Sequence, residues 1–173
     1  KVRSLVEKLI DEDEVDLLMG PYGSGLTLAA AETAEAAQYV MWNHSGSADE
    51  IFECNLNWVV GILSPASQYL CAILELLRKL DPDAKRIALF SAKTGFATDM
   101  ASGALAWIRR EGYTLATHQS YRSGFEDFGS LLNPLKDDPP DWFLGVGRLE
   151  DDIRLGRHGG HFRDRRLDCL FDY

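Results

Sequence analysis

The sequence predicts an α/β fold in which parallel sheets are covered by helices on both faces. Two observations predict it. Six short apolar runs end in Gly, Pro, Ser or other polar residues, and each run is followed by a segment with helical periodicity. Strands that alternate with helices in this way form βαβ units with right-handed crossovers, which build a doubly wound sheet.

The first 63 residues predict three strands and the helices between them. In residues 2–10, apolar residues recur at helical spacing with charges between them, which predicts an opening helix. The expected strands, read as buried apolar runs, are residues 15–19, 39–42 and 58–63. The alanine-rich residues 26–38 have strong helical propensity, and a short helix is expected near Ile51.

The alternation continues after a clear amphipathic helix at residues 67–80, which Asp81 and Pro82 terminate. The expected strands are residues 86–90, 115–121 and 142–146, and the expected helices are residues 98–110, 126–136 and 150–157. Pro134 lies inside the second of these helices, and it should kink that helix or end it early.

Residues 158–173 do not follow this alternation. They combine two glycines with a cluster of arginines (Arg163, Arg165 and Arg166) and an aromatic end. We interpret the segment as an atypical tail, flexible or non-native. A basic nucleic-acid-binding arm is the alternative, but the segment is short and the chain carries a net charge of -9, which disfavours a nucleic-acid surface.

Cysteine and histidine spacing predicts no metal site and no disulfide framework. Cys54, Cys71 and Cys169 are odd in number, far apart and without CxxC spacing, so they do not indicate the redox compartment. His158 and His161 lack a third ligand nearby. No apolar run is long enough to cross a bilayer, and no signal peptide is present. Because the chain opens inside a helix without methionine, we expect a clipped product.

The glycine-rich loop at residues 20–25 does not match the enzymatic motifs that its position suggests. A dinucleotide fingerprint would need a third glycine where Leu28 stands. No Walker lysine follows, and Ser24 has Tyr22 and Leu26 where a nucleophile elbow needs glycines. The sequence therefore predicts a protein that is not an enzyme and uses no cofactor.

Two small hydroxyl-rich loops are the remaining candidate site. Ser24 is expected to be the N-cap of a helix, with the free amides of Gly25 and Leu26 behind it. The second loop, Ser45, Gly46 and Ser47, follows the next expected strand. Hydroxyls, amides and a positive helix end at strand C-termini suit a carboxylate. Each loop alone favours plain capping and turn formation, but together they favour a binding site.

Five strings in the sequence resemble the leucine/isoleucine/valine-binding protein family of type I periplasmic solute-binding proteins. The longest is Asp-Leu-Leu-Met-Gly-Pro-Tyr-Gly-Ser-Gly-Leu-Thr-Leu-Ala at residues 16–29, and the second is Asn-His-Ser-Gly-Ser-Ala-Asp-Glu-Ile-Phe at residues 43–52. The others are residues 86–90, 127–132 and 140–147. The resemblance runs in order, without large gaps, from the first helix to about Arg157.

The resemblance implies two Rossmann-like lobes with parallel sheets, joined by a hinge of crossing strands. Residues 1–62 would be part of lobe 1, residues 63–66 a hinge crossing, residues 67–157 part of lobe 2, and residues 158–173 the atypical tail. The fold would be incomplete. The first two strands of lobe 1 would be missing, as would everything after the third strand of lobe 2.

The resemblance also assigns roles to residues. Ser24 and the loop from Ser45 to Ser47 would hold the α-carboxylate of a ligand, and Phe96 would close over it from lobe 2, where relatives often carry tyrosine. Arg148 stands where an aromatic is common and could pair with a second carboxylate. The acidic partner of an α-amino group would lie beyond Arg157. The candidate ligand-binding residues are Tyr22, Ser24, Gly25, Ser45, Gly46, Ser47, Phe96 and Arg148.

The resulting prediction is a fragment of an extracytoplasmic or periplasmic solute-binding protein. It would bind an amino acid or related small carboxylate between two lobes and deliver it to an ABC transporter permease. Aromatic acids, amides and dicarboxylates remain open as ligands. A ligand-binding sensor or receptor domain of the same fold is the alternative. The missing half of each sheet also predicts that this chain alone forms a homodimer or is a remnant of a larger protein.

Overall fold

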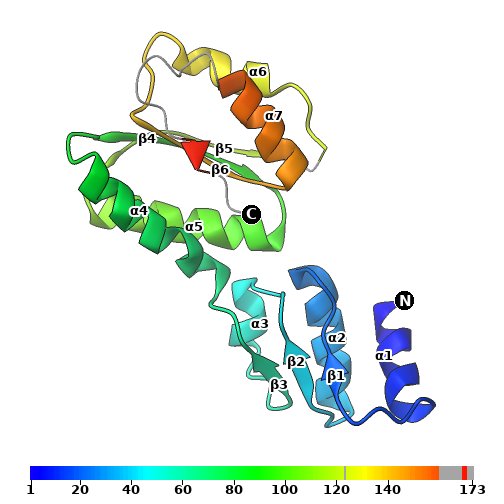
Figure 1. Cartoon of the computed structure of the whole chain (residues 1–173). Helices are drawn as coiled ribbons and strands as arrows, with labels where there is room; N and C mark the ends of the chain where they lie inside the picture. Colours follow the sequence, from blue (N-terminus) through cyan, green and yellow to red (C-terminus); the bar gives the residue numbers. More distant parts are fainter. Residues whose placement is uncertain (123, 160–168, 171–173) are drawn as a thin grey trace. The chain divides into compact units, whose positions relative to one another are not determined.

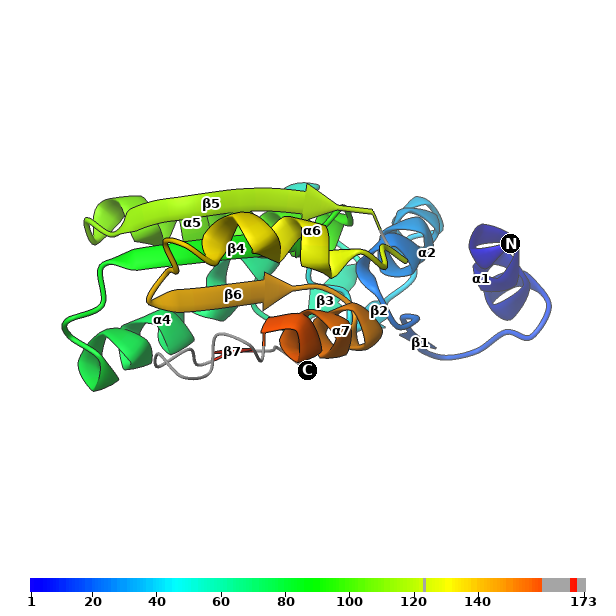
Figure 2. The same ribbon diagram turned by 90° about the horizontal axis from the view of Figure 1, so that it is seen from above.

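The computed structural model describes residues 1–122, 124–159 and 169–170 (Figures 1 and 2). They belong to two compact units, Lys1–Gln68 and Tyr69–Tyr173. Each unit is an α/β structure around its own parallel sheet, so the predicted fold class is confirmed. Among the described residues, none of the helices has both the length and the apolar character that a bilayer crossing requires.

The first unit contains a three-stranded parallel sheet in the order β1-β2-β3. Its strands are β1 (Leu18–Met19), β2 (Met41–Asn43) and β3 (Val59–Gly61). Its helices are α1 (Val2–Asp11), α2 (Ser24–Ala36) and α3 (Asp49–Glu53), followed by the 3₁₀ turn η1 (Ala66–Gln68).

The core of this unit lies between its sheet and its helices. Leu18 and Met41 point to the covered face and pack with Val6 of α1. Three buried alanines of α2 (Ala30, Ala31 and Ala34) complete the cluster. Their small side chains let α2 approach the strands closely, and they favour a helix.

The opposite face of this sheet is not buried, which corrects the expectation of buried strands. Met19, Trp42 and Val60 are 64%, 39% and 42% exposed. The reason is that all three helices of Lys1–Gln68 contribute to the other face: α1 and α2 build the core there, and Phe52 of α3 packs against Gly61. The strands are also shorter than expected.

The second unit contains a four-stranded parallel sheet in the order β5-β4-β6-β7. The strands are β4 (Arg86–Ala92), β5 (Thr114–Tyr121), β6 (Trp142–Val146) and β7 (Cys169–Leu170). Helices α4 (Tyr69–Leu80) and α5 (Gly95–Arg110) cover one face, and α6 (Phe128–Leu132) and α7 (Leu149–Gly159) cover the other (Figures 1 and 2). Accordingly, all five residues of the central strand β6 are buried.

Two expectations about this unit have clear outcomes. Pro134 ends its helix early, as predicted: α6 stops at Leu132, and Pro134 lies in the 3₁₀ turn η2 (Asn133–Leu135). The expectation that strand pairing ends at the third strand is wrong, because Cys169–Leu170 pairs with β6 as a fourth parallel strand. The predicted tail otherwise falls mostly on residues 160–168 and 171–173, which lie outside the described part of the chain.

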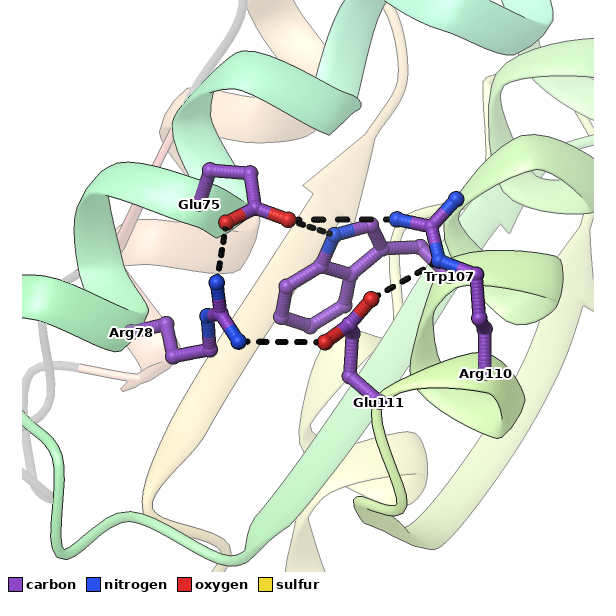
Figure 3. Close-up of polar contacts among 5 residues, drawn as sticks. All are labelled: Glu75, Arg78, Trp107, Arg110 and Glu111. Carbon is purple, nitrogen blue, oxygen red and sulfur yellow. Dashed lines mark hydrogen bonds and ion pairs between the residues drawn. The ribbon is translucent and has the colours of Figure 1, made fainter.

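A ring of charged side chains joins α4 to α5 above a buried indole (Figure 3). Trp107 is 1% exposed and donates its Nε1–H to Oε1 of Glu75 over 3.0 Å. Arg78 bridges Glu75 and Glu111 at 2.8 Å and 3.1 Å. Arg110 contacts Glu111 at 2.7 Å and closes the ring on Glu75 at 3.8 Å. The hydrogen bond from Trp107, with smaller contributions from the arginines, lowers the pKa of Glu75.

Candidate ligand-binding site

The two hydroxyl-rich loops predicted from the sequence meet at the carboxyl edge of the first sheet. Oγ of Ser24, which follows β1, accepts hydrogen bonds from the backbone amides of Ser47 (3.1 Å) and Ala48 (3.0 Å), which follow β2. In the other direction, the Ser45 hydroxyl donates to the carbonyl of Pro21 over 3.1 Å. Parallel strands bring both loops to this edge, and these bonds then fix their relative position.

The expectation that Ser24 caps α2 is wrong. Gly23 occupies the N-cap position with a φ of 91°, and Ser24 is the first helical residue without a side-chain cap bond. A positive φ favours glycine because it has no Cβ. With Gly23 making the turn, the Ser24 side chain is directed to the neighbouring loop instead of its own helix.

Asn43 shapes the second loop, and the sequence analysis did not identify it. This last residue of β2 is fully buried. Its Oδ1 accepts the amides of Ser45 (3.3 Å) and Gly46 (2.8 Å), while its Nδ2 donates to the carbonyl of Gly46 over 2.8 Å. Asparagine commonly forms such local turns, so its position between a strand and a Ser-Gly-Ser loop was the available signal.

Gly46 is required by close packing against α2. A Cβ at this position would lie 2.5 Å from Cβ of Thr27 and 2.6 Å from its Cγ2 and Oγ1. Thr27 is fully buried and donates its hydroxyl to Pro21 over 2.9 Å, so it cannot readily move. The contact holds the second loop directly against the first turn of α2.

These bonds determine which groups remain for a ligand. The backbone N–H groups of residues 45–48 all donate hydrogen bonds to side chains, two to Oδ1 of Asn43 and two to Oγ of Ser24. Ser24 is half-buried and uses its oxygen as an acceptor twice, which leaves its hydroxyl proton as a donor. Gly25 is exposed in the first turn of α2, and Tyr22 is 84% exposed beside it. The arrangement offers hydroxyl and helix-end donors, which suit an anionic group.

In the second unit, Phe96 lies in the first turn of α5, after β4. The hydroxyl of Thr94 caps this helix by accepting the amide of Ala97 over 3.2 Å. The half-buried ring of Phe96 contacts Tyr69 edge to face at 5.6 Å between centroids. The helix start and this aromatic pair therefore set the position of Phe96.

Arg148 follows β6 and is exposed. Its carbonyl accepts the amide of Asp152 over 2.9 Å, and its guanidinium forms no ion pair with another described residue. The preceding Gly147 packs tightly, because a Cβ there would overlap the hydroxyl of Tyr121 and lie 2.7 Å from Oδ1 of Asp152. A closely packed glycine therefore supports an exposed guanidinium at the end of the strand.

Beneath Gly147 lies a buried polar cluster that sequence reasoning missed. Tyr121, Asp151 and Asp152 are each no more than 3% exposed. Burial, and secondarily the carboxylates of Asp152 and Asp151, raises the pKa of Tyr121 well above its ordinary value. Within the described part of the chain, the Tyr121 hydroxyl and Oδ2 of Asp151 have no hydrogen-bond partner. Tyr121 is far in sequence from the adjacent pair Asp151 and Asp152, so no local pattern could indicate their contact.

One serine–histidine contact deserves comparison with catalytic pairs. Oγ of Ser91 lies 3.3 Å from Nε2 of His118 and 3.2 Å from Oγ of Ser120. Desolvation lowers the pKa of His118. Among the described residues, no hydrogen bond connects His118 to a carboxylate that would orient it as a general base. The contact links β4 to β5 across the sheet.

Comparison with known proteins identifies the class to which this fold and these loops belong. The family model described as periplasmic binding protein matches residues 1–155. The chain belongs to the periplasmic binding protein family. Its fold is that of the type I periplasmic binding proteins, and the chain contains about half of that fold.

Three similar proteins illustrate the relationship. A "Leu/Ile/Val-binding protein homolog 7" of Brucella suis is 26% identical over 153 residues, which is 84% of this chain and 38% of the relative. An amino acid ABC transporter substrate-binding protein of Pseudomonas fluorescens superposes with a TM-score of 0.87 at 20% identity, covering 98% of this chain and 46% of that one. A Rhodopseudomonas palustris solute-binding protein in complex with 4-hydroxybenzoate superposes with a TM-score of 0.83 at 16% identity. The match covers 97% of this chain and 46% of that one. The chain thus spans less than half the length of each.

Proposed function

We propose that the chain is part of an extracytoplasmic solute-binding protein that binds an amino acid or a related small carboxylate between two lobes for an ABC importer. The observation that supports this proposal best is the bonding of Ser24 to the amides of Ser47 and Ala48. It sets two loops at neighbouring strand ends, where open α/β sheets bind ligands. The membrane permease of the importer would be the protein partner, and the periplasm the compartment.

In this proposal, the ligand's carboxylate lies at the start of α2. The Ser24 hydroxyl would donate one hydrogen bond, and the exposed amide of Gly25 would donate another. Tyr22 would flank the ligand, and Ser45, Gly46 and Ser47 would form the wall that holds Ser24 in place. A hydrogen bond to a charged group contributes about 1.5–3 kcal/mol. Two or three such bonds would be enough to orient a small acid.

The second unit would supply ligand specificity. Phe96 would provide an apolar contact, and Arg148 could hold a second acidic group with its bidentate guanidinium. The proteins similar to this chain include a Leu/Ile/Val-binding homologue and one bound to 4-hydroxybenzoate, which supports a small carboxylate as the ligand class. We propose residues 63–66 as the first crossing between the lobes, with residues 1–62 in lobe 1 and residues 67–157 in lobe 2.

A titration of the nitrogen-labelled chain, followed by NMR, tests the carboxylate site. Leucine, 4-hydroxybenzoate and succinate would each be compared with leucinamide, 4-hydroxybenzamide and succinamide, which lack the carboxylate. We expect at least one acid, and not its amide, to shift the amide signals of Ser24 and Gly25. Equal effects of acid and amide, or shifts confined to other residues, would refute the assignment.

Affinity in a full-length parent tests the side chains. Replacing Ser24 and Ser47 together by alanine should weaken binding by roughly 2–3 kcal/mol. Arg148→Ala should selectively weaken binding of dicarboxylates. Thr33→Ala is a matched control, because the Thr33 hydroxyl donates within α2, to the carbonyl of Ala29 over 3.0 Å. If calorimetry finds unchanged affinity in the double variant, Ser24 does not donate to the ligand and the loop of Ser47 does not position it.

A further inference from the structure

The segment that leaves β3 is hydrogen-bonded to the rest of the first unit at its two ends. Ile62 donates its backbone N–H to the carbonyl of Asn43 over 3.2 Å. Ala66 donates its backbone N–H to the carbonyl of Ser47 over 2.7 Å. Within residues 63–65, no N–H donates a backbone hydrogen bond to another described residue. This is the crossing between the lobes proposed above, and the bond from Ala66 fixes its far end.

Asp49 adds a second hydrogen bond at the far end of this crossing. Its Oδ1 accepts the backbone N–H of Ser67 over 3.0 Å. Ser67 directly follows Ala66, which is fully buried. Two consecutive N–H groups are therefore held, one by the carbonyl of Ser47 and one by a carboxylate, which accepts the stronger bond. One bond would leave the backbone able to turn about it, whereas two on consecutive residues fix its direction shortly before α4 begins at Tyr69.

Ser47 connects this end of the crossing to the candidate carboxylate site. Its N–H donates to Oγ of Ser24 over 3.1 Å, while its carbonyl accepts from Ala66. The N–H of Ala48 also donates to Oγ of Ser24, over 3.0 Å. Ser47 is 3% exposed and Ala48 is 8% exposed, so water has little access to either residue. Two hydrogen bonds in series therefore link the Ser24 hydroxyl oxygen to the backbone of the crossing.

We propose that Asp49 is a positioning residue that couples the carboxylate site to the crossing. It fixes the direction of residues 66–67, so an acid bound at Ser24 acts through Ser47 on the backbone that leads into the second unit. Asp49 itself does not touch the ligand, because its carboxylate accepts from the crossing. This coupling rests on the proposed function, since Ser24 is the residue assigned there to the ligand's carboxylate.

The amide signals of the nitrogen-labelled 173-residue chain test this coupling without a ligand. Ser24→Ala removes the acceptor of the two N–H groups of residues 47–48. It should therefore shift the amide signals of Ala66 and Ser67, which lie beyond those bonds. Asp49→Ala removes the acceptor of Ser67 and should shift the same two signals. If Ser24→Ala leaves both signals in place, the coupling does not exist and the proposal is overturned.

Three controls separate coupling from general destabilisation. Glu50→Ala is the matched variant, because Glu50 is exposed and also lies in the first turn of α3, next to Asp49. It should leave the signals of residues 66–67 unchanged, and a shift equal to that of Asp49→Ala would refute the role of Asp49. Asp49→Asn keeps an oxygen acceptor without the charge and should shift them less. The Ile62 signal should stay in place throughout, and its displacement with the others would mean loss of packing instead of coupling and overturn the proposal.

A titration with leucine, 4-hydroxybenzoate and succinate separates the coupling from the site itself. We expect the acid that shifts the signals of Ser24 and Gly25 to shift those of residues 66–67 as well. In Asp49→Ala, the first pair of shifts should persist and the second pair should be reduced. If an acid shifts only the first pair, the carboxylate site is correct and the coupling is wrong. If no acid shifts the first pair, the site is wrong, and the response of residues 66–67 to Ser24→Ala decides the coupling.

Discussion

Replacing Gly46 with alanine should destabilise the first unit more than any other single-methyl addition in its loops. The new Cβ would lie 2.5 Å from Cβ of Thr27, a distance that real Cβ contacts essentially never show. Overpacking of this kind costs about 1–3 kcal/mol. If Thr27 moves, its 2.9 Å hydrogen bond to Pro21 is also lost, at a further cost of about 1 kcal/mol. We therefore expect a loss of about 2–4 kcal/mol in the free energy of unfolding.

Urea unfolding followed by circular dichroism measures this loss, and two further variants make the result interpretable. Gly25→Ala adds the same methyl group two residues before Thr27, but no atom lies within 4 Å of it. Since it replaces a helical glycine, it should stabilise by about 0.5–1 kcal/mol. Thr27→Gly removes all three atoms that Gly46→Ala would meet, so in that background the Gly46 substitution should cost little. A cost below about 0.5 kcal/mol in the parent background would show that the close packing described for Gly46 is wrong.

Three further predictions follow from other contacts. Ser24→Ala leaves two nearly buried amides without an acceptor and should destabilise by about 2 kcal/mol, whereas Thr33→Ala should be nearly neutral; chemical denaturation measures both. Tyr121→Phe removes a buried hydroxyl that has no partner among the described residues, so it should raise the melting temperature, and a lower one would reveal a bond to that hydroxyl. Glu75 has a lowered pKa in the folded chain, so its contribution to stability is present above the unfolded value of 4.5 and is lost as pH falls through the folded value. Glu75→Gln should therefore flatten the stability profile in that acidic window, and an unchanged profile would exclude Glu75 as its source.

The sequence was sufficient for the fold because the fold follows from local patterns. The strand at residues 142–146 has its expected bounds. A short apolar run between Asp141 and Gly147, in a chain where strands and helices alternate, predicts a buried strand. Pro134 ended its helix for a backbone reason that needs no partner. The loops around Ser24 and Ser47 were correctly placed at neighbouring strand ends.

Contacts between distant residues could not be predicted in the same way. The Ser24 side chain bonds to residues 47 and 48 and not to its own helix, because Gly23 takes the cap position. Tyr121 lies against Gly147, which only the folded chain brings near. The exposure of Met19 depends on the absence of a helix in Lys1–Gln68 over that face, which no property of the strand itself reveals.

The distribution of indoles gives each unit its own optical signal. Trp42 and Trp58, in the first unit, are 39% and 36% exposed, whereas Trp107 and Trp142, in the second, are 1% and 2% exposed. Tyr113 lies against both buried indoles, at 5.2 Å and 5.1 Å between centroids. Solvent contact shifts indole fluorescence to longer wavelength, so the red edge of the emission reports mainly on the first unit and the blue edge on the second. A single denaturant titration recorded at both edges therefore separates the unfolding of the two units: coincident curves mean one cooperative transition, and displaced curves mean two.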